Sequence, residues 1–164
     1  MFGGKSSELL RRMRRDRVAG KSVLLVTHSS DTRYDDAESN TAVNTHDGVR
    51  SSALRVSCIK DGLPQMQAVD SVFVDELQFF PDLHNLEHVE TVTAAGLLHQ
   101  HMGDTFPNVL ASMNLWHDIV FLHAVCSRCG SQYASRTKRT MPIGESMVGG
   151  AESYTALCAK CFTN

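Results

Sequence analysis

The sequence has no long apolar run. No stretch approaches the ~20 consecutive apolar residues that a membrane-spanning helix needs. Met1 is followed by glycines and a basic segment rather than by the apolar core of a secretory signal. These absences favour a soluble cytoplasmic protein without a membrane partner, and this is the localisation that we expect.

An excess of charge of one sign is also lacking. The chain carries 16 Lys and Arg against 18 Asp and Glu, which gives a net charge of -2 at pH 7 and a pI of about 6.4. Nucleic-acid-binding domains usually show a basic excess, so we expect no nucleic-acid partner. Internal repeats and low-complexity tracts are absent as well, and 164 residues suffice for one domain with a small appendage.

Histidines at the spacing of a catalytic metal site are missing, but paired cysteines are present. Four of the five cysteines form the pairs Cys126-x-x-Cys129 and Cys158-x-x-Cys161. Four thiolates so arranged can hold a tetrahedral Zn²⁺ in a closed, structural site, and metal binding would supply much of the folding energy of a tail with little core. Two redox pairs, or coincidence, are the alternatives. Cys58 is predicted to be a buried small apolar residue.

Short apolar runs alternate with helical patterns before the cysteine-containing tail. Residues 29–52 form a long polar loop in this interpretation. Gly62-Leu63-Pro64 is expected to break the strand predicted at 53–59. Strands are predicted at 22–27, 53–59, 71–76, 92–97 and 118–122, and helices at 6–17, 83–90 and 108–113. This alternation is typical of an α/β domain with a mostly parallel sheet. Composition changes near residue 124, which predicts an α/β domain (1–124) and a zinc-binding subdomain (125–164).

The chain begins in a half-motif for phosphate binding. Gly4-Lys5-Ser6 at the start of a helix is the second half of a P-loop, in which backbone N–H groups and the helix N-terminus face a phosphate. Lys5 would reach the outer phosphates and Ser6 would ligate Mg²⁺. The first glycine of a complete motif would precede Met1. Half-motifs of this kind also occur by chance.

Two carboxylates close the strand predicted at 71–76. In a P-loop protein Asp75 would hold Mg²⁺ through water, and Glu76 would take the proton from an attacking hydroxyl. Arg33, in the polar loop, would stabilise charge on a transferred phosphoryl group. The plainer alternatives are an acidic strand end and an ordinary polar loop.

In chain order, these features match a known family. The landmarks are Met1 to Leu10, Asp31-Thr32-Arg33-Tyr34, Thr45-His46-Asp47, Asp75 to Asp82, the two Cys-x-x-Cys pairs and Val148 to Tyr154. With these the chain resembles, over essentially its whole length, the thymidine kinases of the zinc-containing type. The resemblance implies a P-loop-type α/β fold with a small zinc-binding lasso subdomain. It also implies transfer of the ATP γ-phosphate to the 5′-hydroxyl of thymidine, in nucleoside salvage for DNA synthesis.

The resemblance further implies roles for individual residues. Glu76 is the expected catalytic base, structural Zn²⁺ and Mg²⁺ with ATP are the expected cofactors, and thymidine is the expected substrate. The nucleotide-binding residues are expected to be Gly3, Gly4, Lys5, Ser6, Ser7, Arg33 and Asp75. The substrate-binding residues are expected to be Met1, Phe79, Leu97, His101, Phe106, Met147, Gly149 and Tyr154. Residues 137–150 would form the lasso that closes over the nucleoside, and the chain would assemble as a homotetramer.

The chain departs from the family pattern near the predicted nucleoside pocket. The family has glycine where Leu77 stands, and aspartate, glycine and a stacking phenylalanine where Leu98, His99 and His101 stand. The family's first strand and first P-loop glycine have no counterpart in these residues. Three hypotheses therefore stay open: an active thymidine kinase, a non-catalytic kinase-like interaction or regulatory module, and a P-loop kinase for another nucleoside.

Overall fold

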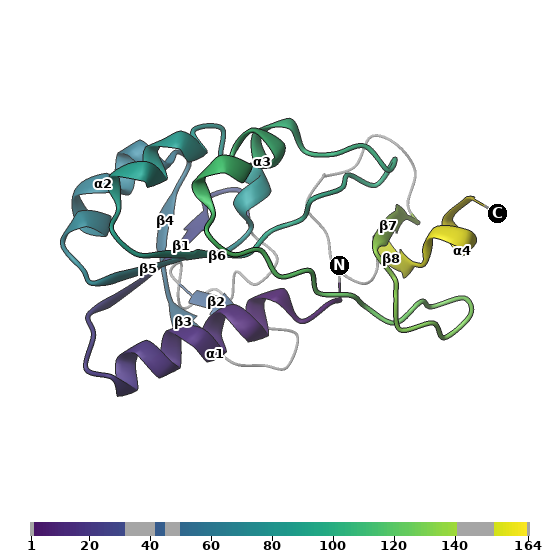
Figure 1. The fold of residues 1–164 in the computed structure, drawn as a ribbon, viewed down its shortest axis with the longest axis horizontal. Helices are drawn as coiled ribbons and strands as arrows, with labels where there is room; N and C mark the ends of the chain where they lie inside the picture. Colours follow the sequence, from purple (N-terminus) through teal and green to yellow (C-terminus); the bar gives the residue numbers. More distant parts are fainter. Residues whose placement is uncertain (1, 32–41, 45–49, 141–152, 164) are drawn as a thin grey trace.

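The computed structural model of the chain describes residues 2–31, 42–44, 50–140 and 153–163. A sheet with its covering helices lies beside a small C-terminal unit (Figure 1). None of the described helices combines the length and the apolar character needed to span a lipid bilayer. The elements, with η for a 3₁₀ helix, are α1 (Lys5–Val18), β1 (Val23–His28), β2 (Ala42–Asn44), β3 (Arg50–Ser52), β4 (Leu54–Val56), α2 (Ile59–Gln67), β5 (Ser71–Val74), η1 (Leu77–Phe79), η2 (Leu83–His88), β6 (Val92–Ala94), α3 (Pro107–Ala111), η3 (Met113–Leu115), β7 (Arg136–Arg139), β8 (Tyr154–Leu157) and α4 (Ala159–Thr163).

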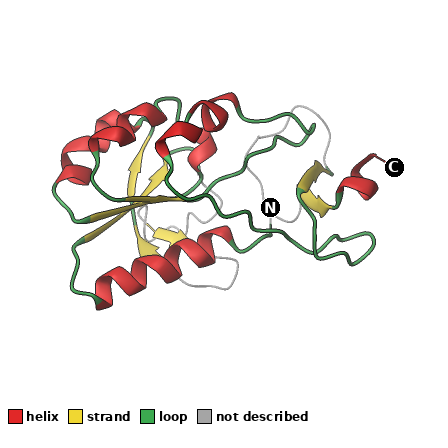
Figure 2. Ribbon diagram, viewed as in Figure 1, coloured by secondary structure: helices red, strands yellow, loops and turns green. Residues whose placement is uncertain are grey.

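The four-stranded sheet is parallel throughout, in the order β4-β1-β5-β6. Its two central strands pair Leu25 with Phe73 and Val26 with Val74. Figure 2 shows α1 on one face of the sheet and α2 and α3 on the other. Because helices cover both faces, the central strands are apolar runs without polar alternation. The predicted α/β fold with a mostly parallel sheet is confirmed.

The predicted first helix is confirmed as α1, which packs an apolar face on the sheet. Leu9, Leu10 and Met13 are buried and form one core cluster with Leu25 and Phe73. The arginines of this helix are mostly exposed on its outer side. Burial of the apolar face fixes where the helix begins relative to the ends of β1 and β5.

Residues 59–67 form α2, a helix that was not predicted from the sequence: the strand expected at 53–59 ends at Val56, and Gly62-Leu63-Pro64 lies inside the helix. A proline inside a helix costs about 3 kcal/mol, and tertiary contacts offset this cost. An added Cβ on Gly62 would lie 3.0 Å from Leu54 and 3.1 Å from Met66, so the helix packs tightly at this point. At the helix start, the Asp82 carboxylate accepts the backbone N–H groups of the first two residues at 2.8 and 3.0 Å.

The other predicted elements are mostly present in shorter form. β4 and β6 occupy parts of the strands expected at 53–59 and 92–97, η2 occupies most of the helix expected at 83–90, and α3 is followed by η3 near 108–113. The loop expected at 29–52 contains the antiparallel pair of β2 and β3. Two strands of three residues leave too short a pattern for sequence periodicity to detect.

The prediction of a strand at 118–122 is wrong. Within the described part of the chain this segment has no ladder partner, and Val120 and Phe121 are 55% and 63% exposed. A cavity of about 980 Å³ is lined by Val92 and Ala94 of β6 and also by this segment. β6 is therefore an edge strand, paired only with β5 among the described strands. An apolar run predicts burial, but a strand also needs a neighbour to pair with.

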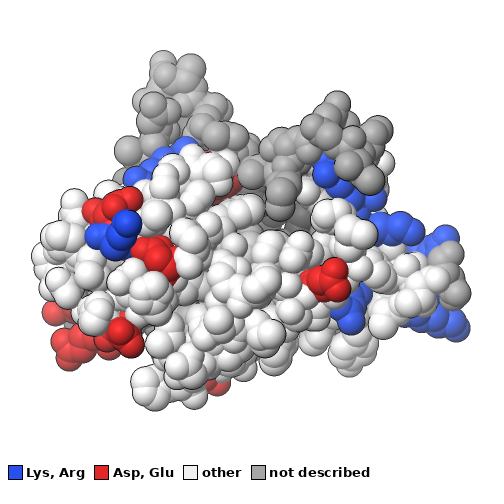
Figure 3. All heavy atoms as spheres, turned by 90° about the horizontal axis from the view of Figure 1, so that it is seen from above, with Lys and Arg blue, Asp and Glu red and all other residues white. Residues whose placement is uncertain are grey.

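The C-terminal unit has its own small core. The β7–β8 hairpin pairs Arg136 with Leu157, and Ala124, Ala134 and Ala156 are buried beside it. Lys and Arg side chains gather at this end of the molecule, whereas acidic side chains lie mostly over the α/β part (Figure 3). The core of the unit starts near the composition change, and the division into domains 1–124 and 125–164 stays a prediction.

Asp82→Ala should destabilise the fold through α2. Because the substitution leaves the N–H groups of Ile59 and Lys60 without their acceptor, we expect the free energy of unfolding to fall by about 1–2 kcal/mol. Urea denaturation followed by circular dichroism measures this loss. Asp118→Ala, at an exposed position, is the control and should change stability by less than about 0.5 kcal/mol. Equal losses in both variants would contradict the role of Asp82.

Candidate active site and metal centre

The start of α1 has the geometry of an anion-binding loop. Gly4 precedes the helix with φ 73°, a left-handed conformation that glycine adopts without strain. Its carbonyl accepts the N–H of Glu8 at 2.9 Å, so the helix begins at Lys5. Gly3 lies against the backbone of Leu122, where an added Cβ would be 3.2 Å from the carbonyl oxygen. The first amides of the helix carry the donors and the dipole that anions bind.

Asp75 meets this loop at the carboxyl end of β5. Its side chain is 3% exposed, and both Ser6 and Lys5 interact with it. Burial, and then the charge of Glu76, raise the pKa of Asp75 to about 6, although Ser6 and Lys5 act in the opposite direction. The fold thus brings together three residues that were predicted to bind nucleotide and metal: Lys5, Ser6 and Asp75.

Glu76 follows in a left-handed backbone conformation, with φ 53° and ψ 45°. Outside glycine this conformation costs about 1–3 kcal/mol and persists only where the surroundings fix it. Here the N–H of Leu77 donates to the carbonyl of Ala95 at 3.0 Å, and the Gln78 side chain donates to Oε2 of Glu76. The Glu76 side chain is 5% exposed. The carboxylate is therefore held in one place beside Asp75.

Leu77 stands where the family that the chain resembles has glycine, and it fits this turn without strain. Its φ is not positive, and its side chain is 6% exposed within the main core cluster. Gly96 provides the room, because a Cβ there would lie 2.7 Å from the Leu77 Cβ. The substitution therefore does not obstruct the turn between Asp75 and Phe79.

Three of the predicted substrate-binding residues lie near this turn or in the core next to it. Phe79 is part of η1, and Leu97 follows β6, where its N–H donates to Oε1 of Gln78 at 2.9 Å. Phe106 packs against the main core cluster. Leu97 is thus tied directly to the turn that carries Glu76.

The other described members of the set lie toward the C-terminal unit. His101 is in a hairpin that spans Leu98–Phe106 and is closed by a main-chain hydrogen bond of 2.9 Å. Arg136 of β7 donates to the carbonyl of Gly103 in this hairpin at 3.0 Å, and Tyr154 is buried on β8. The hairpin therefore joins the sheet to the C-terminal unit.

Four predicted site residues, and most of the predicted lasso, lie outside the described residues. They are Met1, Arg33, Met147 and Gly149. Their roles stay predictions.

Sequence reasoning missed two amide side chains at the acidic turn. Gln78 is 4% exposed and bridges Glu76 and Leu97. Asn108 donates to the carbonyls of Gln78 at 2.9 Å and Phe80 at 2.7 Å. The only signal for Gln78 was its place two residues after Glu76, and nothing in the sequence marks Asn108.

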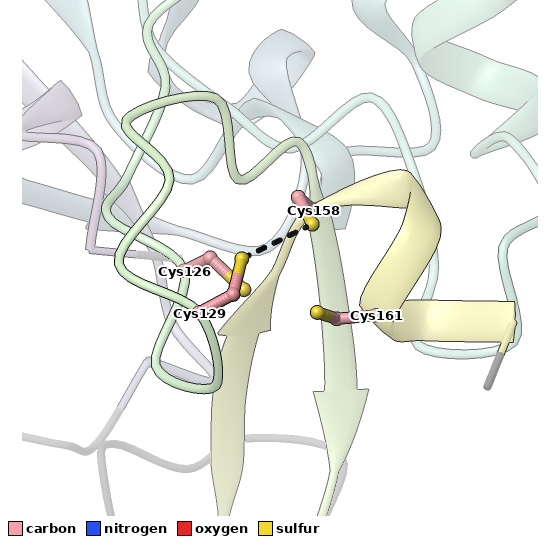
Figure 4. Close-up of side chains that lie close together, drawn as sticks. All are labelled: Cys126, Cys129, Cys158 and Cys161. Carbon is pink, nitrogen blue, oxygen red and sulfur yellow. Dashed lines mark hydrogen bonds between the residues drawn. The ribbon is translucent and has the colours of Figure 1, made fainter.

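The four paired cysteines converge on one point (Figure 4). Their four Sγ atoms all lie within 4.8 Å of one another, and those of Cys129 and Cys158 are 3.8 Å apart. A tetrahedral Zn²⁺ with Zn–S bonds of about 2.3 Å requires sulfur atoms about 3.8 Å apart. The four sulfurs therefore fit a metal ion. Cys58 precedes α2, partly exposed, rather than lying in a strand as predicted.

The protonation of these thiols also favours a cation. Backbone N–H groups, first that of Cys158, lower the pKa of Cys126 to about 6. Burial and then the three neighbouring thiols raise the pKa of Cys161 to about 12. The first thiolate forms readily and the last is strongly opposed, so full deprotonation of the cluster calls for a bound positive ion.

Cys158→Ser should remove the metal and the order of the C-terminal unit. We expect one zinc per chain in the native protein, measured by plasma mass spectrometry, and well below one in the variant, because three thiolates bind zinc more weakly than four. Cys58→Ser is the matched control and should keep the full metal content. Unchanged zinc in Cys158→Ser, or zinc-free native protein with an ordered tail, would contradict the assignment.

Asp75→Asn should stabilise the ligand-free protein. A folded pKa of about 6 against 3.8 for the unfolded chain means that ionisation of Asp75 costs stability progressively from pH 3.8 to about 6. The amide avoids this cost, so the free energy of unfolding should rise by about 3 kcal/mol at pH 7.5 and by about half as much at pH 5. Urea denaturation at both values measures it.

Asp70→Asn is the control, and it should change the free energy of unfolding in the opposite direction. Hydrogen bonds from the Ser22 hydroxyl and N–H lower the pKa of Asp70, so its ionised form contributes stability above pH 3.8 that is lost as the pH falls through the folded pKa. The amide should therefore lower stability at pH 7.5. A loss of stability in Asp75→Asn at that pH would contradict the cost assigned to Asp75.

Comparison with known proteins agrees with the geometry. A family profile described as thymidine kinase matches residues 1–162. Thymidine kinase 1 of Dictyostelium discoideum is 32% identical over 170 residues, which cover 100% of this chain and 74% of that protein. The cytosolic thymidine kinase of Gallus gallus is 35% identical over 170 residues, covering 99% and 73%. The thymidine kinase of Monkeypox virus is 33% identical over 168 residues, covering 99% and 92%. The chain therefore belongs to the thymidine kinase family of transferases.

Proposed function

We propose that this chain transfers the γ-phosphate of ATP to the 5′-hydroxyl of thymidine. The observation that carries the proposal is the interaction of Ser6 and Lys5 with the buried carboxylate of Asp75. It joins the anion-binding start of α1 to the acidic end of β5, and ligands of parallel sheets bind at the carboxyl ends of the strands. Lys5 and the first amides of α1 would hold the phosphates there, and Arg33 would contact the transferred group.

Magnesium with ATP suits the same place. The Ser6 hydroxyl and the Asp75 carboxylate are oxygen ligands of the kind that Mg²⁺ prefers. A carboxylate whose pKa is raised by burial gains from a nearby cation. Bound there with ATP, Mg²⁺ would neutralise charge on the β- and γ-phosphates.

Glu76 is proposed as the base that takes the proton from the 5′-hydroxyl. Its buried carboxylate is the one next to Asp75 along the chain, and the fixed turn keeps it at the same end of the sheet. General-base catalysis of this kind contributes about 10²–10⁴-fold to rate. The strain-free fit of Leu77 removes one objection to an active enzyme, since the turn keeps its shape without the family's glycine.

The remaining roles are part of the same proposal. Thymidine would be bound by Met1, Phe79, Leu97, His101, Phe106, Met147, Gly149 and Tyr154, with residues 137–150 as the lasso and Zn²⁺ as a structural ion at the four cysteines. The enzyme would work as a homotetramer in the cytoplasm. His101 in place of a stacking phenylalanine should weaken nucleoside binding. The relatives bear the name of the enzyme, so the non-catalytic module is not proposed.

Glu76→Gln should lower kcat for thymidine phosphorylation at least about 100-fold, because the amide cannot accept the proton. A radiometric assay with ATP, Mg²⁺ and thymidine measures this, and thymidine binding by calorimetry should persist. Glu87→Gln, an exposed position of η2, is the control and should keep full activity. A zinc-loaded, folded native chain that phosphorylates no thymidine would overturn the proposal, and other nucleosides run in parallel would reveal a different substrate.

A further inference from the structure

We propose that Gln78 is the positioning residue of this site: its side chain aims the Glu76 carboxylate and ties it to the strand exit at Leu97. This inference rests on the proposed function, in which Glu76 is the base. Gln78 itself touches no substrate in this role and acts through Glu76.

The contacts of Gln78 fix which way its amide group faces. The N–H of Leu97 lies 2.9 Å from one end of the carboxamide, and an N–H donor requires an oxygen there. The NH₂ end then faces Oε2 of Glu76, to which it donates. Both ends of the amide are satisfied only in this orientation. The side chain is 4% exposed, so water does not readily replace either bond.

The Glu76 carboxylate needs a hydrogen-bond donor such as Gln78 because its surroundings disfavour a negative charge. It is buried beside a second buried carboxylate, Asp75, and its own backbone is left-handed. A buried charge without hydrogen bonds is costly. The left-handed backbone of Glu76 does not by itself fix the direction of its side-chain carboxylate, so a hydrogen-bond partner is needed to do so. The bond from Gln78 to Oε2 holds the carboxylate in one direction.

The other end of Gln78 links the base to the nucleoside side of the site. Leu97 lies three residues after the end of β6 and immediately before the hairpin Leu98–Phe106. An added Cβ on Gly96 would lie 3.0 Å from Oε1 of Gln78, so the strand exit passes very close to this side chain. One amide thus sets the base and the strand exit relative to each other.

The backbone of Gln78 is anchored independently of its side chain. Asn108 donates to the carbonyls of Gln78 and Phe80, and this holds the turn from the side of α3. A substitution of the Gln78 side chain therefore removes the link to Glu76 and Leu97 while the turn keeps this support.

Gln78→Met tests the link, because methionine has a similar length but neither donor nor acceptor. We expect kcat to fall about 10–100-fold with the KM for ATP changed less than about 2-fold, since misplacement of a catalytic group lowers rate more than binding. In a Glu76→Ala background the same substitution should change residual activity by less than about 2-fold. Gln67→Met, at an exposed position of α2, is the matched control and should leave kinetics unchanged.

Amide hydrogen exchange at Leu97 supplies a readout that does not depend on activity. Exchange should accelerate in Gln78→Met. In Gln78→Glu it should stay slow while kcat falls, because a carboxylate oxygen still accepts the Leu97 N–H but cannot donate to Glu76. An equal kcat loss in the native and Glu76→Ala backgrounds, or unchanged exchange at Leu97 in Gln78→Met, would overturn the proposal. A native chain that is inactive would refute the proposed function instead, and the Leu97 exchange would then decide alone whether the link exists.

Discussion

The interaction of Ser6 and Lys5 with Asp75 is the contact on which the proposed site depends, because it joins two segments that are far apart in the sequence. It forms only if α1 is packed so that its first turn reaches the end of β5. Leu9, Leu10 and Met13 provide that packing against Leu25 and Phe73. The chemistry of the loop is thus set by apolar burial on the far side of the same helix. A core substitution there would move Lys5 and Ser6, which are proposed to bind phosphate, without contacting them.

The fold could be predicted where burial leaves a simple pattern. The central strands are covered on both faces, so their apolar runs were readable, and the cysteine spacing indicated a metal-binding cluster. Helix α2 was missed because its stability comes from elsewhere: Asp82, more than twenty residues away, accepts the N–H groups at its start. The segment 118–122 was misread because apolar composition says nothing about whether a partner strand is adjacent. Both errors concern long-range contacts that a local pattern does not contain.

Asp75 and Glu76, and the Lys5–Ser6 start of α1, could be predicted from the sequence because phosphate and magnesium binding require those residue types at the end of a strand or the start of a helix. The side chains that position the acidic turn could not be predicted. Gln78 and Asn108 are ordinary amides in the sequence, and only the fold shows which atoms they meet. The left-handed conformation of Glu76 is similarly invisible, since a glutamate gives no sign of an unusual φ. The roles of Arg33, Met147 and Gly149 stay predictions, because these residues lie outside the described part of the chain.

The edge formed by β6 has a consequence for how the protein behaves at high concentration. In a parallel strand alternate residues turn their N–H and C=O groups to opposite sides, so Val92 and Ala94 direct theirs away from β5. Both residues line the cavity. The exposed Val120 and Phe121 belong to the segment that lines this cavity. Among the described residues these backbone groups of β6 have no strand partner, and such groups with apolar neighbours are a template for pairing with another chain. With only three residues, β6 offers few such groups, and this shortness limits edge-to-edge aggregation.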